Sequence, residues 1–353
     1  MGALDAALAA ILIAHSVDIA RLDANEKAKV LDLLKRLESD LTKLLSVQVL
    51  SEMGKQSTNA VLREVTALIQ GAYTEAAITT QETLAGLAEV QSTATVQALE
   101  SVLNITIGPG SKPTAGYLEK LASNVLIEGA PSAQWWSKQA GDTAFRFSQA
   151  VRTGLAAGET NQQIIARVAG TKDVPGVMDI ARKNAAALVQ TSVQTVANEA
   201  RLATFRKNAD ITNGVRYLAT LDSHTCSACG VRDGLTWDLD GKPLEGNDLP
   251  FAAPPIHFNC RCTTIAVLKP MSEISGGTLP DLPNNGMRAS TDGPVKATVN
   301  FSDWFAGRTE SQQAEQFGAG KAAMYRAGKI SLRDMLDQKG NTLTLDALRK
   351  RHE

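Results

Sequence analysis

Residues 254–262 read PPIHFNCRC and place one histidine and two cysteines, His257, Cys260 and Cys262, directly after two prolines. The chain has 353 residues but only four cysteines and four histidines. A cluster of such rare residue types indicates that these side chains either bind a ligand or stabilise the fold. The other two cysteines of the chain show which kind of site this is.

A second pair of cysteines lies upstream. Cys226 and Cys229 form a C-x-x-C-G motif, whose two-residue spacing lets both sulfur atoms face one ion. The following Gly230 permits a tight backbone turn. His257 and Cys260 have a comparable chelating spacing, so we predict a tetrahedral Cys₃His site for a structural Zn²⁺ ion.

Cys262 is a fifth candidate ligand. If a strand begins at Cys260, then Cys260 and Cys262 share one face with Cα atoms about 6.5 Å apart, and the spacing leaves open which of them binds the metal. Two other interpretations remain. The thiols could be reduced and metal-free in a small core, or Cys226 and Cys229 could do redox chemistry, because C-x-x-C also occurs in thioredoxin-like motifs. The residues that follow, GVRDG, show no helix opening of the redox type, which favours metal.

Other polar residues near these motifs receive structural interpretations. His224 lies inside the loop of the first cysteine pair, and we expect it to face solvent. Arg261 should point away from the metal and pair with a carboxylate such as Asp222. The sequence has no G-x-S-x-G motif, Walker loop, H-E-x-x-H motif or dinucleotide fingerprint, so we predict no catalytic residues and no enzyme activity.

Composition limits the function further. The hydrophobic fraction is 44%, which supports real cores, and the formal net charge of −1 disfavours a protein that coats DNA through many phosphate contacts. The opening MGALDAALAAILIAHS has Asp5 and no basic start, and its apolar run is shorter than the roughly 20 residues of a membrane span. We therefore predict an amphipathic helix, no membrane partner, and cysteines in a reducing cytoplasm.

Helical patterns dominate the chain up to residue 208. Asp23 and Glu26 resemble a capping box at a helix start, and Thr160 or Asn161 is expected to cap a later helix after Gly158. An apolar seam with heptad spacing favours a helix in an antiparallel hairpin over an intermolecular coiled coil. The seam consists of Val30, Leu34, Leu37, Leu41 and Leu44.

A β-rich module follows the helices. Alternating apolar residues at 214–222, Asp-Gly turns at 233–234 and 240–241, and a β-rich run at 261–269 predict a small antiparallel sheet. The fold class is therefore α+β and mostly α-helical. The expected organisation is a helical N-terminal body, a β module with a zinc knuckle and a helical C-terminal tail. The predicted parts are a helical region at 1–125, a domain at 126–268 that ends in the zinc-binding β module 214–268, a Pro/Gly-rich linker at 269–299 and the tail at 300–353.

The combined signature resembles the phage head morphogenesis family of Mu F-like minor head proteins. Its pattern is a strand ending in Leu-Asp, then Thr-Cys-x-x-Cys, an Asp-Gly turn and Pro-Pro-x-His-x-x-Cys-Arg-Cys. The likeness covers roughly residues 130–350, whereas the first 120 residues are recognised only as helical. The matching positions are Asp222, Thr225, Cys226, Cys229, Asp233, Gly234, Pro254, Pro255, His257, Cys260, Arg261 and Cys262.

The resemblance implies a minor virion protein that is present in few copies. Such a protein would join the procapsid near the portal and affect assembly, DNA packaging or DNA delivery. Its implied partners are the portal protein and other head proteins, with at most weak contact to packaged DNA. Its implied locations are the virion head and, during assembly, the host cytoplasm.

Three alternatives come from other functional classes. A His-Asn-His-type nuclease also uses zinc knuckles, and His257 and Asn259 are present, but a second C-x-x-C pair is absent. A zinc-dependent nucleic-acid-binding protein would show affinity that falls steeply with salt. An ADP-ribosyltransferase effector is the third, but the last 50 residues are too short and too helical for such a domain.

Overall fold

The computed structural model describes residues 2–47, 54–276 and 287–352. Residues 277–286 of the predicted linker lie outside the described residues. The chain groups into two compact units. The sheet unit comprises Met1–Asp18, Glu89–Leu118 and Ala197–Glu353, and the helical unit comprises Ile19–Ala88 and Glu119–Val196. The domain boundaries predicted from the sequence stay a prediction.

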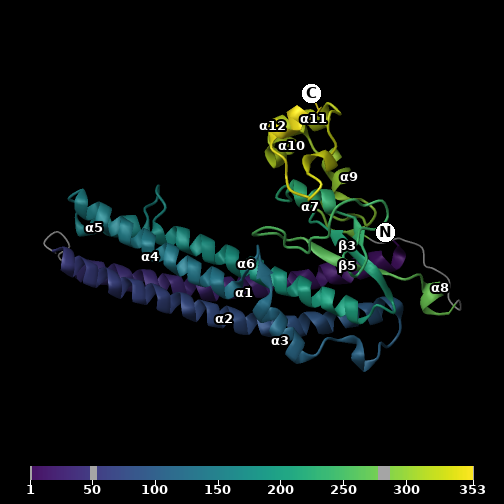
Figure 1. Cartoon of the computed structure of the whole chain (residues 1–353), viewed down its shortest axis with the longest axis horizontal. Coiled ribbons are helices and arrows are strands. Elements are labelled where there is room, and N and C mark those ends of the chain that lie inside the picture. The colour runs from purple at the N-terminus through teal and green to yellow at the C-terminus, as the bar shows by residue number, and fades with distance from the viewer. Residues whose placement is uncertain (1, 48–53, 277–286, 353) are drawn as a thin grey trace. The chain divides into compact units, whose positions relative to one another are not determined.

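Helices make up most of the described chain, which confirms the mostly α-helical class (Figure 1). Four of them are long: α1 (Ala3–Val47), α2 (Lys55–Leu103), α4 (Ser132–Ala156) and α6 (Val177–Lys207). The shorter elements among them are η2 (Pro109–Ser111), α3 (Ala115–Asn124), α5 (Asn161–Ala169) and the two-stranded ladder of β1 (Leu126–Ile127) with β2 (Ala130–Pro131).

Within the helical unit, α1 and α2 form the antiparallel hairpin that the leucine seam predicts. The Oγ1 of Thr83 donates a 2.9 Å hydrogen bond to Glu26 Oε2 across the pair. The seam residues Val30, Leu34, Leu37 and Leu41 are buried, whereas the fifth, Leu44, is only half-buried. Burial of this stripe, rather than helix propensity, supplies most of the stability of such long helices.

One predicted helix start is wrong and another is confirmed. Asp23 and Glu26 lie in the middle of α1, so they form no capping box. Instead, Asp23 accepts a 2.7 Å bond from Lys27 Nζ. Thr160 does cap α5, because its hydroxyl accepts a bond from the Gln163 N–H while the Gln163 side chain accepts one from the Thr160 N–H.

The sheet unit contains the predicted antiparallel sheet. Its central strand is β3 (Thr212–Leu218), with β4 (Thr236–Trp237) on one side and β5 (Thr263–Leu268) on the other. Val215 pairs with Ala266, and Tyr217 pairs with Thr264. The alternating apolar residues at 214–222 therefore correctly predicted a strand, β3.

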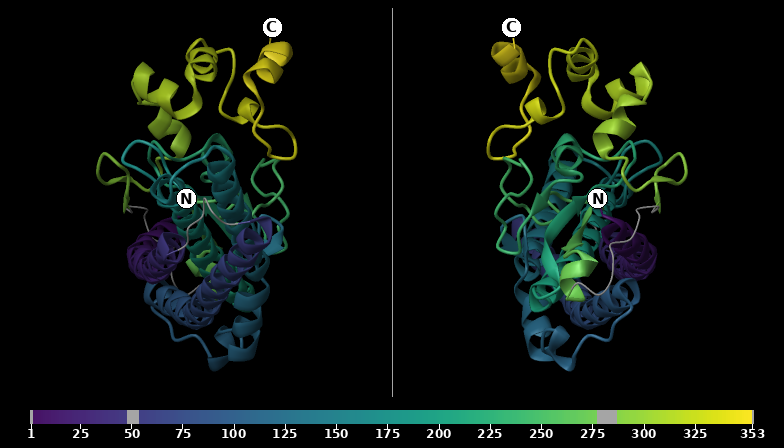
Figure 2. Two further views of the ribbon diagram at one scale, coloured as in Figure 1. Left: turned by 90° about the vertical axis from the view of Figure 1, so that its left-hand side faces the viewer. Right: turned by 90° about the vertical axis from the view of Figure 1, so that its right-hand side faces the viewer.

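The start of α1 packs into the core of the sheet unit. In the ribbon view, the N-terminal end of α1 lies beside the sheet (Figure 2). Leu4, Leu8 and Leu12 are buried there, and Asp5 accepts a 3.0 Å hydrogen bond from the Leu268 N–H at the end of β5. Contrary to the sequence-based expectation, α1 does contain an 18-residue window that is long and apolar enough to cross a membrane by length and composition. The buried leucines account for part of this apolar character.

The C-terminal part of the sheet unit is helical, as predicted. A second core of the unit includes Phe301, Trp304, Phe305 and Leu348. The predicted linker contains short elements before this core, so it is partly structured where it is described. The elements of the linker are α8 (Met271–Ile274), β6 (Met287–Arg288) and β7 (Val295–Lys296). The elements of the tail are α9 (Phe301–Ala306), α10 (Glu310–Phe317), α11 (Ala319–Arg326), η3 (Arg333–Met335) and α12 (Leu345–His352).

Candidate metal centre

The first cysteine pair lies at the start of a short helix, α7 (Ser227–Arg232). Cys226 is its N-cap, and the Cys226 sulfur accepts a 3.4 Å hydrogen bond from the Cys229 N–H. The expectation that no helix opens at this motif is therefore wrong. A helix start favours thiolate at the N-cap, because the free N–H groups there stabilise negative charge. The C-x-x-C geometry alone is thus compatible with both metal binding and redox chemistry.

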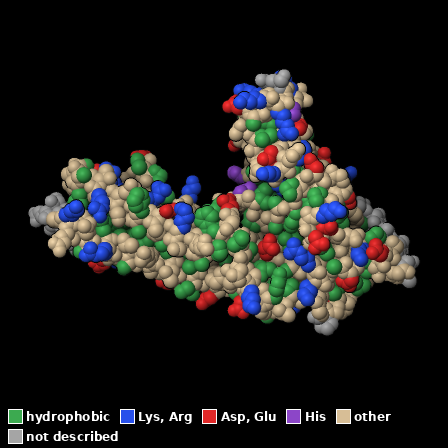
Figure 3. Space-filling view, in the orientation of Figure 1, with side chains coloured by type: hydrophobic (Ala, Val, Ile, Leu, Met, Phe, Trp, Pro, Cys, Tyr) green, Lys and Arg blue, Asp and Glu red, His purple; other side chains and the backbone are tan. Residues whose placement is uncertain are grey.

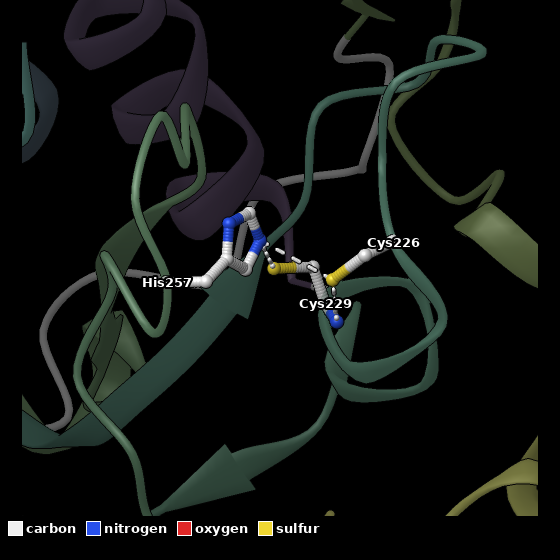
Figure 4. Close-up of side chains that lie close together, drawn as sticks. All are labelled: Cys226, Cys229 and His257. Carbon is white, nitrogen blue, oxygen red and sulfur yellow. Dashed lines mark hydrogen bonds between the residues drawn. The ribbon is translucent and has the colours of Figure 1, made fainter. Parts of the chain in front are cut away.

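His257 reaches this pair from the loop between β4 and β5. Its Nε2 atom lies 3.2 Å from Cys226 Sγ and 3.4 Å from Cys229 Sγ, and the ring points at both sulfur atoms (Figure 4). Its Nδ1 atom lies 2.8 Å from the carbonyl oxygen of Phe258. This contact suits a donating Nδ1–H, which leaves Nε2 as the ring atom that would bind a metal ion. Metal-binding histidines commonly have the same arrangement.

Cys260 and Cys262 complete the cluster. Cys260 Sγ lies 3.6 Å from Cys229 Sγ, and the sulfur atoms of Cys229, Cys260 and Cys262 lie within 4.8 Å of one another. The structure therefore brings all five predicted residues together, with Cys229 common to two groups of three. Because β5 begins only at Thr263, the two later cysteines precede the strand rather than share its face.

The spacing of these atoms suits a tetrahedral zinc ion. Bonds of about 2.3 Å to sulfur and about 2.0 Å to nitrogen place neighbouring ligand atoms about 3.5–3.8 Å apart. The separations of 3.2, 3.4 and 3.6 Å in the cluster are close to these values. The 3.6 Å sulfur separation also far exceeds the roughly 2.05 Å of a disulfide bond. The residues present therefore fit a zinc ion.

The electrostatics of the cluster also favour a cation. Hydrogen bonds with the Cys229 thiol and with His257 lower the pKa of Cys226 to about 4. Hydrogen bonds to the Cys226 and Cys260 thiols raise the pKa of His257 to about 11. The pKa of Cys260 is lowered as well, by its hydrogen bond with Cys229, whereas hydrogen bonds with Cys226 and Cys260 raise the pKa of Cys229. Negative charge thus collects on Cys226 and Cys260, beside a protonated His257 ring. A divalent ion would neutralise this charge and displace the thiol protons.

Comparison with known proteins gives one match. Residues 146–265 match the family Phage Mu protein F like protein. This Mu F-like segment runs from α4 into β5 and contains all five candidate ligands. The match confirms the resemblance and supports a phage head-related protein. No curated protein and no solved structure matches the chain significantly.

An ion pair joins the two cysteine loops of the Mu F-like segment. Arg261 Nη1 lies 2.6 Å from Asp222 Oδ2, which confirms the pairing expected from the sequence. Asp222 Oδ1 also accepts a 2.9 Å bond from the N–H of His224, whose side chain is exposed as expected. The pair therefore fixes the loop before Cys226 against the loop between Cys260 and Cys262.

The structure adds two supports that the sequence did not reveal. The hydroxyl of Tyr217 on β3 donates a 3.3 Å hydrogen bond to Cys229 Sγ, and burial raises the pKa of this tyrosine. A Cβ atom at Gly230 would lie 2.4 Å from the Phe301 ring. Gly230 lies in α7 and is not among the positive-φ glycines, so close packing rather than a tight turn explains it.

A buried ion pair lies beside the Mu F-like segment's Asp-Gly turn. Asp233 Oδ2 lies 2.8 Å from Arg288 Nη1, with the two side chains 0% and 4% exposed. Asp233 also accepts 2.7 Å bonds from the N–H groups of Ala219 and Phe301. The sequence indicated Asp233 as part of a turn. It could not indicate Arg288 as the partner, because the two residues are 55 positions apart.

Proposed function

We propose that the chain is a minor phage head protein that acts through protein contacts, with a structural zinc ion bracing its central module. The observation that carries this proposal is the match over residues 146–265. The proposed partners are the portal protein and other head proteins, and the proposed stages of action are head assembly and DNA packaging or delivery. The proposed locations are the virion head and the host cytoplasm during assembly.

The proposed zinc ligands are Cys226, Cys229, His257 and Cys260. His257 supports this set because its Nε2 atom faces two of the sulfurs. Cys260 supports it because its Sγ atom lies 3.6 Å from Cys229 Sγ and its N–H donates a 3.3 Å hydrogen bond to the His257 carbonyl. The pKa of Cys260 is lowered, chiefly by its hydrogen bond with Cys229. Against the opposing effect of Cys229, the pKa of Cys262 is instead raised by its hydrogen bond with Cys260 and by burial, so we assign Cys262 a position beside the four ligands. Such a set closes the coordination sphere, as structural zinc sites do.

A pair of serine variants tests this assignment. Cys260→Ser is expected to lower bound zinc from about one equivalent to less than about a tenth, because a closed structural site needs all four ligands. Cys262→Ser is expected to keep the metal. Elemental analysis of purified protein measures both. The opposite outcome, with zinc lost only from the Cys262 variant, would make Cys262 the fourth ligand.

Charge and geometry weigh against the alternatives. On the face that Figure 3 shows, Lys and Arg side chains are interspersed with Asp and Glu rather than gathered in one patch. The formal net charge of the chain is −1, which supports at most weak contact with DNA, because strong binding needs an excess of clustered cations. A His-Asn-His nuclease would need a free His257 ring. Both of its nitrogen atoms instead face partners, Nδ1 the Phe258 carbonyl and Nε2 the thiols.

Fractionation of phage particles tests the head assignment. The protein is expected in purified virions and in DNA-free procapsids, and it should co-purify with portal protein. Quantitative mass spectrometry of both particles gives its copy number relative to portal. Virions of full titre that lack the protein would contradict the proposal, as would the absence of any association with a head component.

A further inference from the structure

A groove runs along the helical unit between α2 and α4. It consists of two adjoining hollows of about 560 and 430 Å³, and Ala77, Ile78, Ala133 and Trp136 line both of them. Residues of α3 line one end, through Glu119 and Ser123.

The groove has the length and the lining of a helix-binding site. The α2 residues that line it recur every three or four positions from Gln70 to Ala85, so they lie on one helix face. At 1.5 Å per residue this face is about 22 Å long, the length of about four helical turns. Small side chains on both walls let a third helix approach closely. These are Ala77, Ala85, Ser123, Ser132, Ala133, Ser137, Ala140 and Gly141.

The middle of the groove is apolar, and one end is acidic. Trp136 lies 2% exposed in its floor, while Ile78 is 56% exposed beside it. The lining includes the exposed carboxylates Glu82 and Glu119 but no lysine, arginine or histidine. A partner with Lys or Arg at that end would gain favourable electrostatics. Two copies that paired through this same face in an antiparallel dimer would each bring two carboxylates and no cation.

We propose that this groove binds a helix of another head protein. The helix presents small apolar residues to the middle of the groove and a lysine or arginine to Glu82 and Glu119. The proposal rests on the function proposed above and deepens it, because it gives the helical unit a partner surface separate from the metal centre.

Two matched glycine variants test the groove. Gly141 lines it and Gly86 does not, yet both are exposed, both lie in helices, and a Cβ at either position would meet no atom within 4 Å. Replacing glycine inside an exposed helix does not reduce helix propensity, so both variants should fold. Gly141→Trp is expected to lower the protein's content in purified heads by about tenfold, a loss of about 1.4 kcal/mol of binding free energy. Gly86→Trp should leave that content unchanged.

Charge reversal and crosslinking identify the occupant. The double variant Glu82→Lys, Glu119→Lys should also lower incorporation into heads. A photo-crosslinking amino acid at Ser137 should attach to a helical segment of a different head protein that carries Lys or Arg. Crosslinking to a second copy of this chain, or equal incorporation of both glycine variants, would overturn the groove while leaving the head assignment intact. Absence of the wild-type protein from heads would overturn both.

Discussion

Replacing Cys229 with alanine is expected to strip the metal from the protein and unfold the segment around β3–β5. Cys229 is the residue common to both groups of candidate ligands, and its side chain is 1% exposed. Bound zinc should fall from about one equivalent to below about a tenth, because the binding free energy of a structural zinc is also folding free energy. Elemental analysis and thermal unfolding followed by circular dichroism measure the two effects.

His224→Ala is the matched control for this experiment. His224 lies in the same loop as the first cysteine pair, but its side chain is exposed and belongs to neither ligand group. The control should keep its zinc and its melting temperature, whereas a strong chelator should reproduce the Cys229 effect in the wild-type protein. Two results together would show that the cysteines form only a thiol core. The wild-type protein would purify without zinc, and the Cys229 variant would stay fully folded.

Asp233→Ala should lower the free energy of unfolding of the sheet unit by about 3–5 kcal/mol, because removing one partner leaves a buried charge uncompensated. The change removes the carboxylate that pairs with the buried guanidinium of Arg288. It also removes the hydrogen-bond acceptor of the Ala219 and Phe301 N–H groups. Denaturation by urea, followed by circular dichroism, measures the loss.

Two further variants show whether burial causes the effect. Asp32→Ala breaks the 2.7 Å pair with Arg36, whose side chains are 64% and 63% exposed, and should cost no more than about 1 kcal/mol. Combining Asp233→Ala with Arg288→Met should recover part of the lost stability, since no unpaired charge remains. Equal costs for the Asp233 and Asp32 variants would refute a buried ion pair.

Local sequence signals predicted the fold only where local physics decides it. Thr160 caps α5 because its hydroxyl and the Gln163 side chain satisfy N–H groups within one turn. The same pattern at Asp23 and Glu26 was misleading, because helix α1 continues through it. Asp23 instead pairs with Lys27 one turn later in α1, and Glu26 accepts a hydrogen bond from Thr83 of α2. Two polar residues three apart carry no information about what lies across a helix pair.

In the metal centre, too, the contacts between residues near the motifs were predictable, and those set by the tertiary fold were not. Cysteine and histidine spacing predicted the residues that the fold brings together, because chelating pairs are short-range features. The contact between Arg261 and Asp222 was also predictable, since both residues flank the cysteine motifs. Tyr217 and Arg288 were not, because each acts on a residue that only the tertiary fold brings near.

The contact between Gly230 and Phe301 restricts how this chain can change over time. Any side chain at position 230 would occupy space that the Phe301 ring already fills, and that ring belongs to the core of the C-terminal helices. A larger residue at 230 is therefore tolerated only together with a smaller one at 301. Substitutions in the metal-binding loop and in the C-terminal helices therefore depend on each other at this contact, although the two positions are 71 residues apart in the sequence.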